Sequence, residues 1–248
     1  MSKAPTTRSH TIAVNSLWMT ADNVLSIAGG TLASVAVART FGPELLGDYT
    51  YVMYLVQLTS TIGRFGLPVA TRKYLAEFAD QPGVAHGILK ALFRTQFLFG
   101  ILCVLGGALT VILKTDQSKW PFALAGILSI LPSMITAVVT GANLSAERFA
   151  PNVKASVVGT VLNLGGIFLT VVLGGGLWGL SASLFLSRMA DLMVRYVSYR
   201  SAFKEVLSTP PIPISAEIKQ RLRKFCAHQT ALQAMTLVFW DRSELSRN

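Results

Sequence analysis

The sequence has few of the residues from which catalytic and metal sites are built. Its 248 residues include two cysteines, which are far apart in the chain, and three scattered histidines, so neither a disulfide framework nor a zinc-ligand spacing is present. Carboxylates lie singly or in short pairs on separate segments, whereas acid–base and nucleophilic catalysis need clustered carboxylates or a nucleophile with a base at its side. We therefore expect no catalytic residue, no metal site and no cofactor, and a protein that is not an enzyme.

Charge is also scarce, whereas apolar residues are abundant. Only 14% of the residues are charged and 52% are hydrophobic, and the mean hydropathy is +0.51. In a soluble domain roughly a quarter of the residues are charged, and a disordered chain has low hydrophobicity. The composition thus excludes both and predicts an all-α, polytopic integral membrane protein.

Six apolar runs are long enough to cross a bilayer, which needs about 20 residues in a helix. They are residues 17–38, 49–67, 95–113, 121–142, 153–173 and 177–199, with the start of a seventh at 225–240. The predicted organisation is a cytoplasmic N-terminus (1–16), a six-helix transmembrane lobe (17–199), a cytoplasmic linker (200–224), and a truncated seventh helix with its tail (225–248).

The distribution of basic residues predicts the orientation. The chain carries 22 Lys and Arg against 12 Asp and Glu, and most basic residues fall on one side of the membrane when the N-terminus is cytoplasmic. By the positive-inside rule, we expect a multi-pass membrane protein of that orientation and no nucleic-acid partner. The family resemblance described below implies that this membrane is the bacterial inner membrane. Within the linker, Ile218, Leu222 and Phe225 recur at helical spacing among basic residues. This stretch is either a helix on the anionic surface of membrane lipids or a solvated connector.

Three of the predicted spans carry polar residues three or four positions apart, which places them on one helix face. These stripes are Thr50, Tyr54, Gln57, Thr61 and Arg64; Ser129, Ser133, Thr136, Thr140 and Asn143; and Ser156, Thr160, Asn163 and Thr170. Such stripes either pack helix on helix or line a wet cavity. Packing suits the small residues, whereas three polar faces favour a cavity that includes Gln57, Thr136 and Asn163.

Ionisable residues within the spans support a polar cavity, because each charged side chain is energetically costly in a bilayer unless it is solvated or paired. Arg188 lies near the middle of the sixth span, and Asp191 and Arg195 share its face. Asp191 can pair with either arginine, so one arginine is left for the cavity. We predict that Arg188, Arg64 and Asp191 line it. Asp191 could equally form a structural salt bridge, and Arg64, near the inner end of its span, could equally extend to the lipid headgroups. Asp22, in the first span, is either a proton or cation site or an interfacial acid.

A sequence signature joins the first two spans. Residues 35–75 read VAVARTFGPELLGDYTYVMYLVQLTSTIGRFGLPVATRKYL. The stretch resembles the N-terminal signature of polysaccharide and O-antigen flippases, in the multidrug/oligosaccharidyl-lipid/polysaccharide exporter superfamily. The matching residues are Ala38, Arg39, Phe41, Gly42, Pro43, Glu44, Gly47, Tyr49, Gly66, Leu67 and Pro68, and a weaker likeness to a seventh-helix motif follows at Trp-Asp-Arg-Ser-Glu, 240–244.

The resemblance implies two lobes of six helices around a cavity that opens alternately to each side. It implies a substrate in which an oligosaccharide is joined through pyrophosphate to a polyprenyl lipid, with cavity arginines binding the pyrophosphate. It also implies a role in cell-surface polysaccharide synthesis, such as that of lipopolysaccharide O-antigen. An acidic residue of the first helix couples cations in some relatives, and Asp22 matches it in helix and type.

The chain covers one lobe and the opening of a seventh helix, so we expect an incomplete half. Its partners would be the lipid-linked oligosaccharide, membrane lipids, and a missing C-terminal lobe or second chain. Two alternatives are a multidrug or cation exporter of the same superfamily and a non-transporting membrane scaffold.

Overall fold

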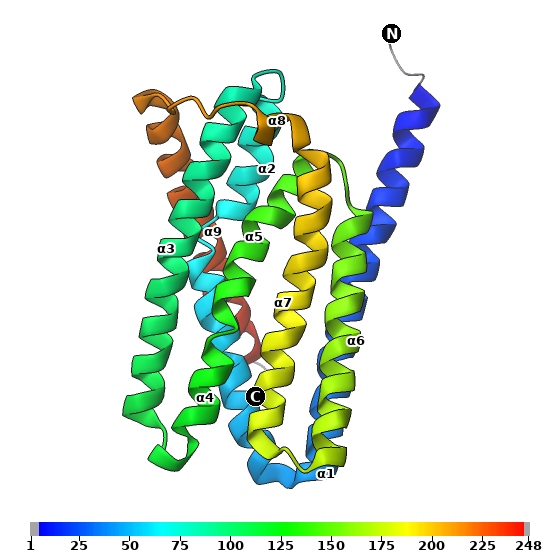
Figure 1. Ribbon diagram of the computed structural model, residues 1–248, viewed down its shortest axis with the longest axis vertical. Helices are drawn as coiled ribbons and strands as arrows, with labels where there is room; N and C mark the ends of the chain where they lie inside the picture. The colour runs from blue at the N-terminus through cyan, green and yellow to red at the C-terminus, as the bar shows by residue number, and fades with distance from the viewer. Residues whose placement is uncertain (1–4, 246–248) are drawn as a thin grey trace.

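The computed structural model describes residues 5–245, and all regular structure in this range is helical (Figure 1). This confirms the all-α membrane fold. The helices are α1 (Pro5–Gly63), α2 (Leu67–Glu77), α3 (Pro82–Lys114), η1 (Gln117–Lys119), α4 (Trp120–Ile127), α5 (Ile130–Ser145), α6 (Ala150–Leu173), α7 (Gly176–Ala202), α8 (Lys204–Ser208) and α9 (Ala216–Leu245). Five helical runs among the described residues are long and apolar enough to cross a membrane: Ser16–Glu77, Pro82–Lys114, Gln117–Ser145, Ala150–Leu173 and Gly176–Ala202.

The first run contains two of the six predicted spans, because α1 folds back on itself. Gly42 has φ 82° and ψ 175°, outside the helical region, and Pro43 follows it. A residue without Cβ adopts this positive φ at low cost. In Figure 1 the chain descends along the first arm of α1 and returns beside it toward α2. Five runs therefore carry the six predicted spans.

Two predicted spans are interrupted where proline removes a backbone donor. The second arm of α1 ends at Gly63, Phe65 and Gly66 take positive φ, and Pro68 begins α2. The predicted span 121–142 is likewise split into α4 and α5, because Pro132 cannot donate a hydrogen bond to residue 128. Helix α3 is longer than the apolar stretch that predicts it, because it begins at Pro82 and the predicted span begins at 95.

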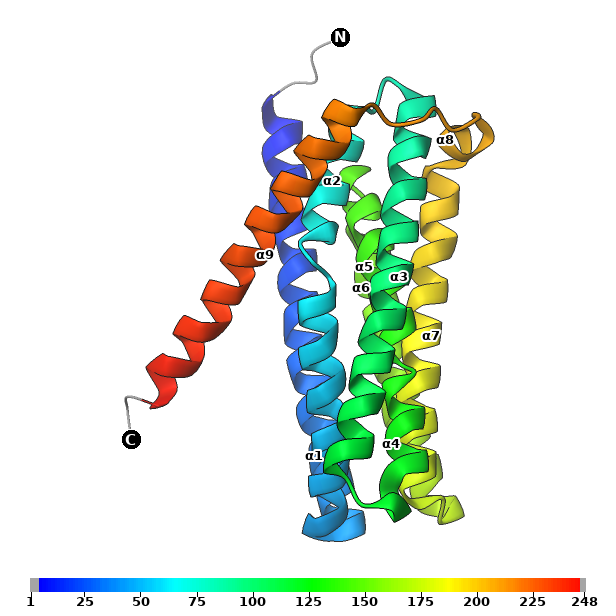
Figure 2. The same cartoon turned by 90° about the vertical axis from the view of Figure 1, so that its left-hand side faces the viewer.

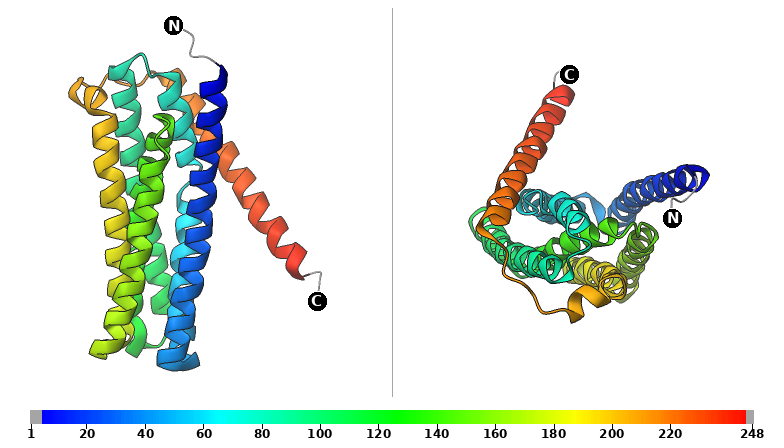
Figure 3. Two further views of the ribbon diagram at one scale, coloured as in Figure 1. Left: turned by 90° about the vertical axis from the view of Figure 1, so that its right-hand side faces the viewer. Right: turned by 90° about the horizontal axis from the view of Figure 1, so that it is seen from above.

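Helix α9 joins two elements that the sequence separates. The basic stretch 216–225 and the predicted seventh span 225–240 form one continuous helix. Ile218, Leu222 and Phe225 are partly buried and pack against the protein's own core, so this apolar face covers part of the bundle. Figures 2 and 3 show α9 leaving the bundle at an angle. The side chains of the 240–244 motif and the chain ends at 1–4 and 246–248 lie outside the described residues.

Small residues let the long helices approach closely, as is common in membrane bundles. Gly159 and Gly166, seven positions apart, share the face of α6 that meets α7. A Cβ at Gly166 would lie 2.5 Å from Ser183 Oγ, and one at Gly159 would lie 3.2 Å from the Asp191 Cβ. The α6–α7 contact therefore positions Asp191, a residue of the predicted cavity.

Gly166→Val should force α6 and α7 apart and lower the stability by about 1–3 kcal/mol, the usual cost of overpacking. Gly165→Val is the matched control, because a Cβ at Gly165 meets nothing within 4 Å. Thermal unfolding in detergent, followed by circular dichroism, measures both. Equal unfolding temperatures for the two variants would contradict the proposed close contact.

A cationic cavity between α1, α5, α6 and α7

Residues from five helices enclose a cavity of about 570 Å³. Both arms of α1, together with α5, α6 and α7, form its walls, and Pro68 of α2 contributes at the helix break. The structure brings together every residue that the sequence proposed for the site: Asp22, Gln57, Arg64, Thr136, Asn163, Arg188 and Asp191 all line it. Their roles stay predictions, but their common location is a structural fact.

The polar stripes divide between this cavity and dry helix contacts. On the second arm of α1, Gln57 and Arg64 line the cavity, whereas Tyr54 is 60% exposed on the outside of the bundle. On α5, Thr136 and Thr140 line it, and Ser133 is buried with its hydroxyl donating to a backbone carbonyl. The two interpretations of each stripe, cavity and packing, thus apply to different residues of the same face.

The α6 stripe divides in the same way. Ser156, Thr160 and Asn163 line the cavity. Thr170 is buried, and its hydroxyl donates to the Gly166 carbonyl at 2.7 Å. Gly29 on the first arm of α1 lies against Thr160, which brings Asp22 and its helix close to α6.

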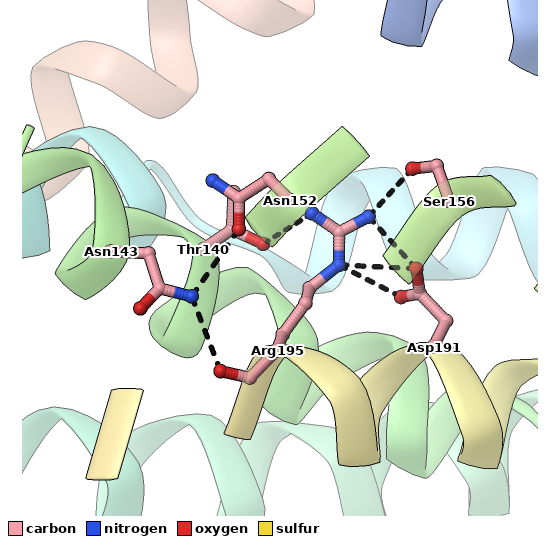
Figure 4. A network of polar contacts seen from close by, with 6 residues as sticks. All are labelled: Thr140, Asn143, Asn152, Ser156, Asp191 and Arg195. Carbon is pink, nitrogen blue, oxygen red and sulfur yellow. Dashed lines mark hydrogen bonds and ion pairs between the residues drawn. The ribbon is translucent and has the colours of Figure 1, made fainter. Parts of the chain in front are cut away.

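Asp191 forms its ion pair with Arg195, not with Arg188 (Figure 4). The Arg195 Nη2 and Asp191 Oδ1 atoms are 2.8 Å apart, and Arg195 Nε lies 3.1 and 3.0 Å from the two carboxylate oxygens. The other guanidinium contacts are donated to Thr140 Oγ1 of α5 at 3.3 Å and to Ser156 Oγ of α6 at 2.8 Å. This pair therefore links three helices of the cavity wall.

Two asparagines extend the network along the backbone. Asn143 Nδ2 donates to the Arg195 carbonyl at 3.2 Å and to Asn152 Oδ1 at 3.3 Å. Asp191 and Arg195 are only 8% and 7% exposed, so each charge depends on the other for solvation. Each of the three guanidinium nitrogens of Arg195 therefore donates to a partner within the protein.

Arg64 and Arg188 are not committed in this way. In residues 5–245 the Arg188 side chain forms no hydrogen bond or ion pair, and Arg64 Nε is buried without a partner. Arg188 and Arg195 lie close enough to Arg64 for their positive charges to repel its guanidinium group. Three arginines and two aspartates line the cavity, so its formal net charge is +1. A buried, unpartnered guanidinium is costly alone and is suited to an anion.

Three further polar atoms of the lining are buried and have no hydrogen-bond partner among the described residues. They are Asp22 Oδ1, Thr136 Oγ1 and Asn163 Oδ1. In the same part of the chain, no group of three or more His, Cys, Asp or Glu side chains could hold a metal ion. The site offers positive charge and hydrogen-bonding groups.

Gln96 of α3 supports Arg64, and the sequence interpretation missed it. Its side chain is fully buried, and Nε2 donates to the Gly63 carbonyl at 3.1 Å, where α1 ends one residue before Arg64. A helix break frees carbonyls that need donors, so the Gly66-Leu-Pro68 signal predicts a nearby donor. It does not predict which residue supplies it, because Gln96 belongs to no polar stripe.

Comparison with known families gives one result. Residues 12–241 match the family described as "Polysaccharide biosynthesis protein". The chain belongs to the polysaccharide biosynthesis protein family. The match spans all six predicted transmembrane segments and reaches into α9, which confirms the resemblance drawn from residues 35–75. Comparison with curated proteins finds no match. Members of this family are multi-pass membrane proteins of polysaccharide synthesis, in agreement with the helical runs above.

Asp191→Asn should leave Arg195 as a buried, unpaired charge and destabilise the bundle by about 3–5 kcal/mol. The same-spacing pair Glu217–Arg221 on α9 is exposed, so Glu217→Gln should cost less than about 1 kcal/mol. Chemical unfolding of both variants in detergent provides the comparison. A cost for Asp191→Asn as small as that for Glu217→Gln would show that the network does not hold the three helices together.

Proposed function

We propose that this chain forms the cavity lobe of a flippase that carries a polyprenyl-pyrophosphate-linked oligosaccharide across the bacterial inner membrane. The cavity binds the pyrophosphate through Arg64 and Arg188, and the N-terminus is cytoplasmic. The protein performs no covalent chemistry in this role. Alternating access requires two bundles that move against one another, so a second bundle, in a further lobe or a second chain, completes the transporter.

The observation that carries the proposal is the unequal use of the three cavity arginines. Arg195 is bound by Asp191, Thr140 and Ser156, whereas Arg64 and Arg188 retain their donors for a ligand. A pyrophosphate carries several negative oxygens, and guanidinium groups bind phosphate oxygens with paired hydrogen bonds. The family assignment supports the proposal, because the chain belongs to a family of polysaccharide biosynthesis proteins and the proposed substrate is a sugar chain joined to a lipid pyrophosphate.

The cavity supports the alternatives less well. A cationic drug would meet two uncommitted arginines and one uncommitted aspartate, so its binding would be opposed by charge. A non-transporting scaffold would have polar stripes that are packing seams throughout. Here Thr136 and Asn163 border a cavity of about 570 Å³.

Binding of polyprenyl pyrophosphate to the purified full chain tests the proposal directly. Arg64→Gln and Arg188→Gln should each weaken binding about tenfold or more, since a hydrogen bond to a charged group contributes about 1.5–3 kcal/mol. Arg148→Gln, at an exposed loop residue outside the cavity, should leave the affinity unchanged. Thermophoresis in detergent measures the affinities, with circular dichroism to confirm folding.

The phosphate-free polyprenol serves as the ligand control for this experiment. It should bind far more weakly than the pyrophosphate to the unmodified chain. Equal affinities for the two lipids, or equal losses in Arg148→Gln and Arg188→Gln, would refute the assignment of the arginines.

Cysteine labelling distinguishes a wet cavity from a dry seam. In a chain with Cys103 and Cys226 replaced by alanine, Thr136→Cys and Asn163→Cys should react with a small, charged thiol reagent, because a solvated thiol can ionise. Ser133→Cys on the same α5 stripe is the matched control and should stay unlabelled, since Ser133 is buried between helices. Labelling of all three, or of none, would be inconsistent with the division of the stripe.

A further inference from the structure

A groove, separate from the arginine-lined cavity, lies between α3, the 209–215 linker and the start of α9. Its volume is about 750 Å³. The linker crosses from α8 to α9 along the end of the bundle where the N-terminus lies (Figure 2). It is fastened to α3, because the Ile212 amide donates to the Gly83 carbonyl at 2.9 Å and His86 Nδ1 lies 2.6 Å from the Thr209 carbonyl oxygen. Residues 211–214 of this linker line one side of the groove.

Four basic residues line the groove in two facing pairs. Lys90 and Arg94 are one helical turn apart on α3, and Lys219 and Arg223 are one turn apart on α9. Residues at this spacing share a helix face. No carboxylate lines the groove. None of the four cations forms an ion pair or hydrogen bond in the described part of the chain, so their charge is available to a ligand.

Farther along both helices the lining becomes apolar. On α3 the cations are followed by Leu98 and Phe99, and Phe99 stacks on Phe65 with ring centroids 5.5 Å apart. On α9 they are followed by Cys226. At 1.5 Å per residue, Leu98 lies about 12 Å along the helix axis from Lys90. Helices α3 and α9 start at the same end of the bundle and then diverge (Figure 2).

We propose that this groove binds an anionic phospholipid of the leaflet on the N-terminal side. The phosphate lies between the two basic pairs beneath the 209–215 linker, and an acyl chain follows Leu98 and Phe99 in the space between the diverging helices. Both the charge and the direction of the polar-to-apolar change match a lipid standing in its own leaflet. A free phosphate would use only the basic end. The site is separate from the arginine cavity, and the inference does not rest on the proposed function.

The bound lipid would also hold α9 against the bundle. Helix α9 makes its main contacts with α2, where the Phe225 ring packs edge-on against Tyr74. It also lies close to Gly66, where a Cβ would meet Gln229 and the Cys226 carbonyl. On the α3 side the groove separates the two helices, so a lipid there fills the gap.

Electron spin resonance of spin-labelled lipids tests the site in nanodiscs that hold the full chain. Phosphatidylglycerol should associate more strongly than phosphatidylcholine. The double variants Lys90→Gln/Arg94→Gln and Lys219→Gln/Arg223→Gln should each reduce this preference at least about fivefold, which corresponds to about 1 kcal/mol, the contribution of a single basic residue at a membrane surface.

Controls separate the groove from general surface charge. Arg148→Gln/Lys154→Gln removes two exposed cations outside the groove and should keep the preference, as should the charge-retaining Lys90→Arg/Arg94→Lys. A loss as large in Arg148→Gln/Lys154→Gln as in the groove variants would overturn the proposal.

If a Gln variant fails to fold, competition on the unmodified chain still decides the occupant. Unlabelled phosphatidylglycerol should displace the labelled lipid, whereas inorganic phosphate at matched ionic strength should not. Displacement by phosphate, or preferential displacement by polyprenyl pyrophosphate, would show that the groove is not a phospholipid site.

Discussion

The buried Asp191–Arg195 pair is the interaction on which the rest of the cavity depends. It fixes α7 against α5 and α6 through Thr140 and Ser156, and it neutralises one of three arginines in the site. In a low-dielectric bundle a carboxylate binds strongly to the arginine that it can reach with good geometry. Because Asp191 is used in this way, Arg188 and Arg64 remain as the free positive charge of the cavity.

Backbone interruptions place those free arginines. Arg64 lies in the break between Gly63 and Leu67, where Pro68 and the positive φ of Gly66 prevent a continuous helix. Irregular backbone at membrane depth is tolerated where it borders a cavity or is buried in protein. Gln96 meets part of the cost by donating to the carbonyl at the helix end. Gly66 also lets α9 approach the break closely, because it has no Cβ to meet Gln229 and Cys226. The break therefore serves both the cavity and the packing of α9.

Much of the site could be predicted from the sequence, because polar residues at helical spacing are conspicuous in apolar spans. Helical spacing predicts Gln57, Thr136 and Asn163, and the presence of a charge within an apolar span predicts Arg188. Helical spacing gives a face but not the neighbour of that face, so it could not assign Asp191 to Arg195 over Arg188. It also could not separate Tyr54, which points outward, from Gln57 on the same stripe.

The sequence is less informative about features that depend on contacts between distant segments. The continuity of α9 was hidden by its change from basic to apolar residues. The basic groove depends on the 209–215 linker bringing α9 beside α3, residues more than one hundred positions apart, and no local pattern announces such a contact.

Solid-state NMR provides the most direct test of the division between structural and ligand-binding arginines. Dipolar contacts between ³¹P of polyprenyl pyrophosphate and ¹⁵N of labelled guanidinium groups report which arginines touch the phosphates in nanodiscs. The account predicts contacts in the unmodified chain that disappear in Arg64→Gln/Arg188→Gln, although Arg195 is still present. Contacts that persist in that double variant would assign the phosphates to Arg195 or to another arginine and contradict the account.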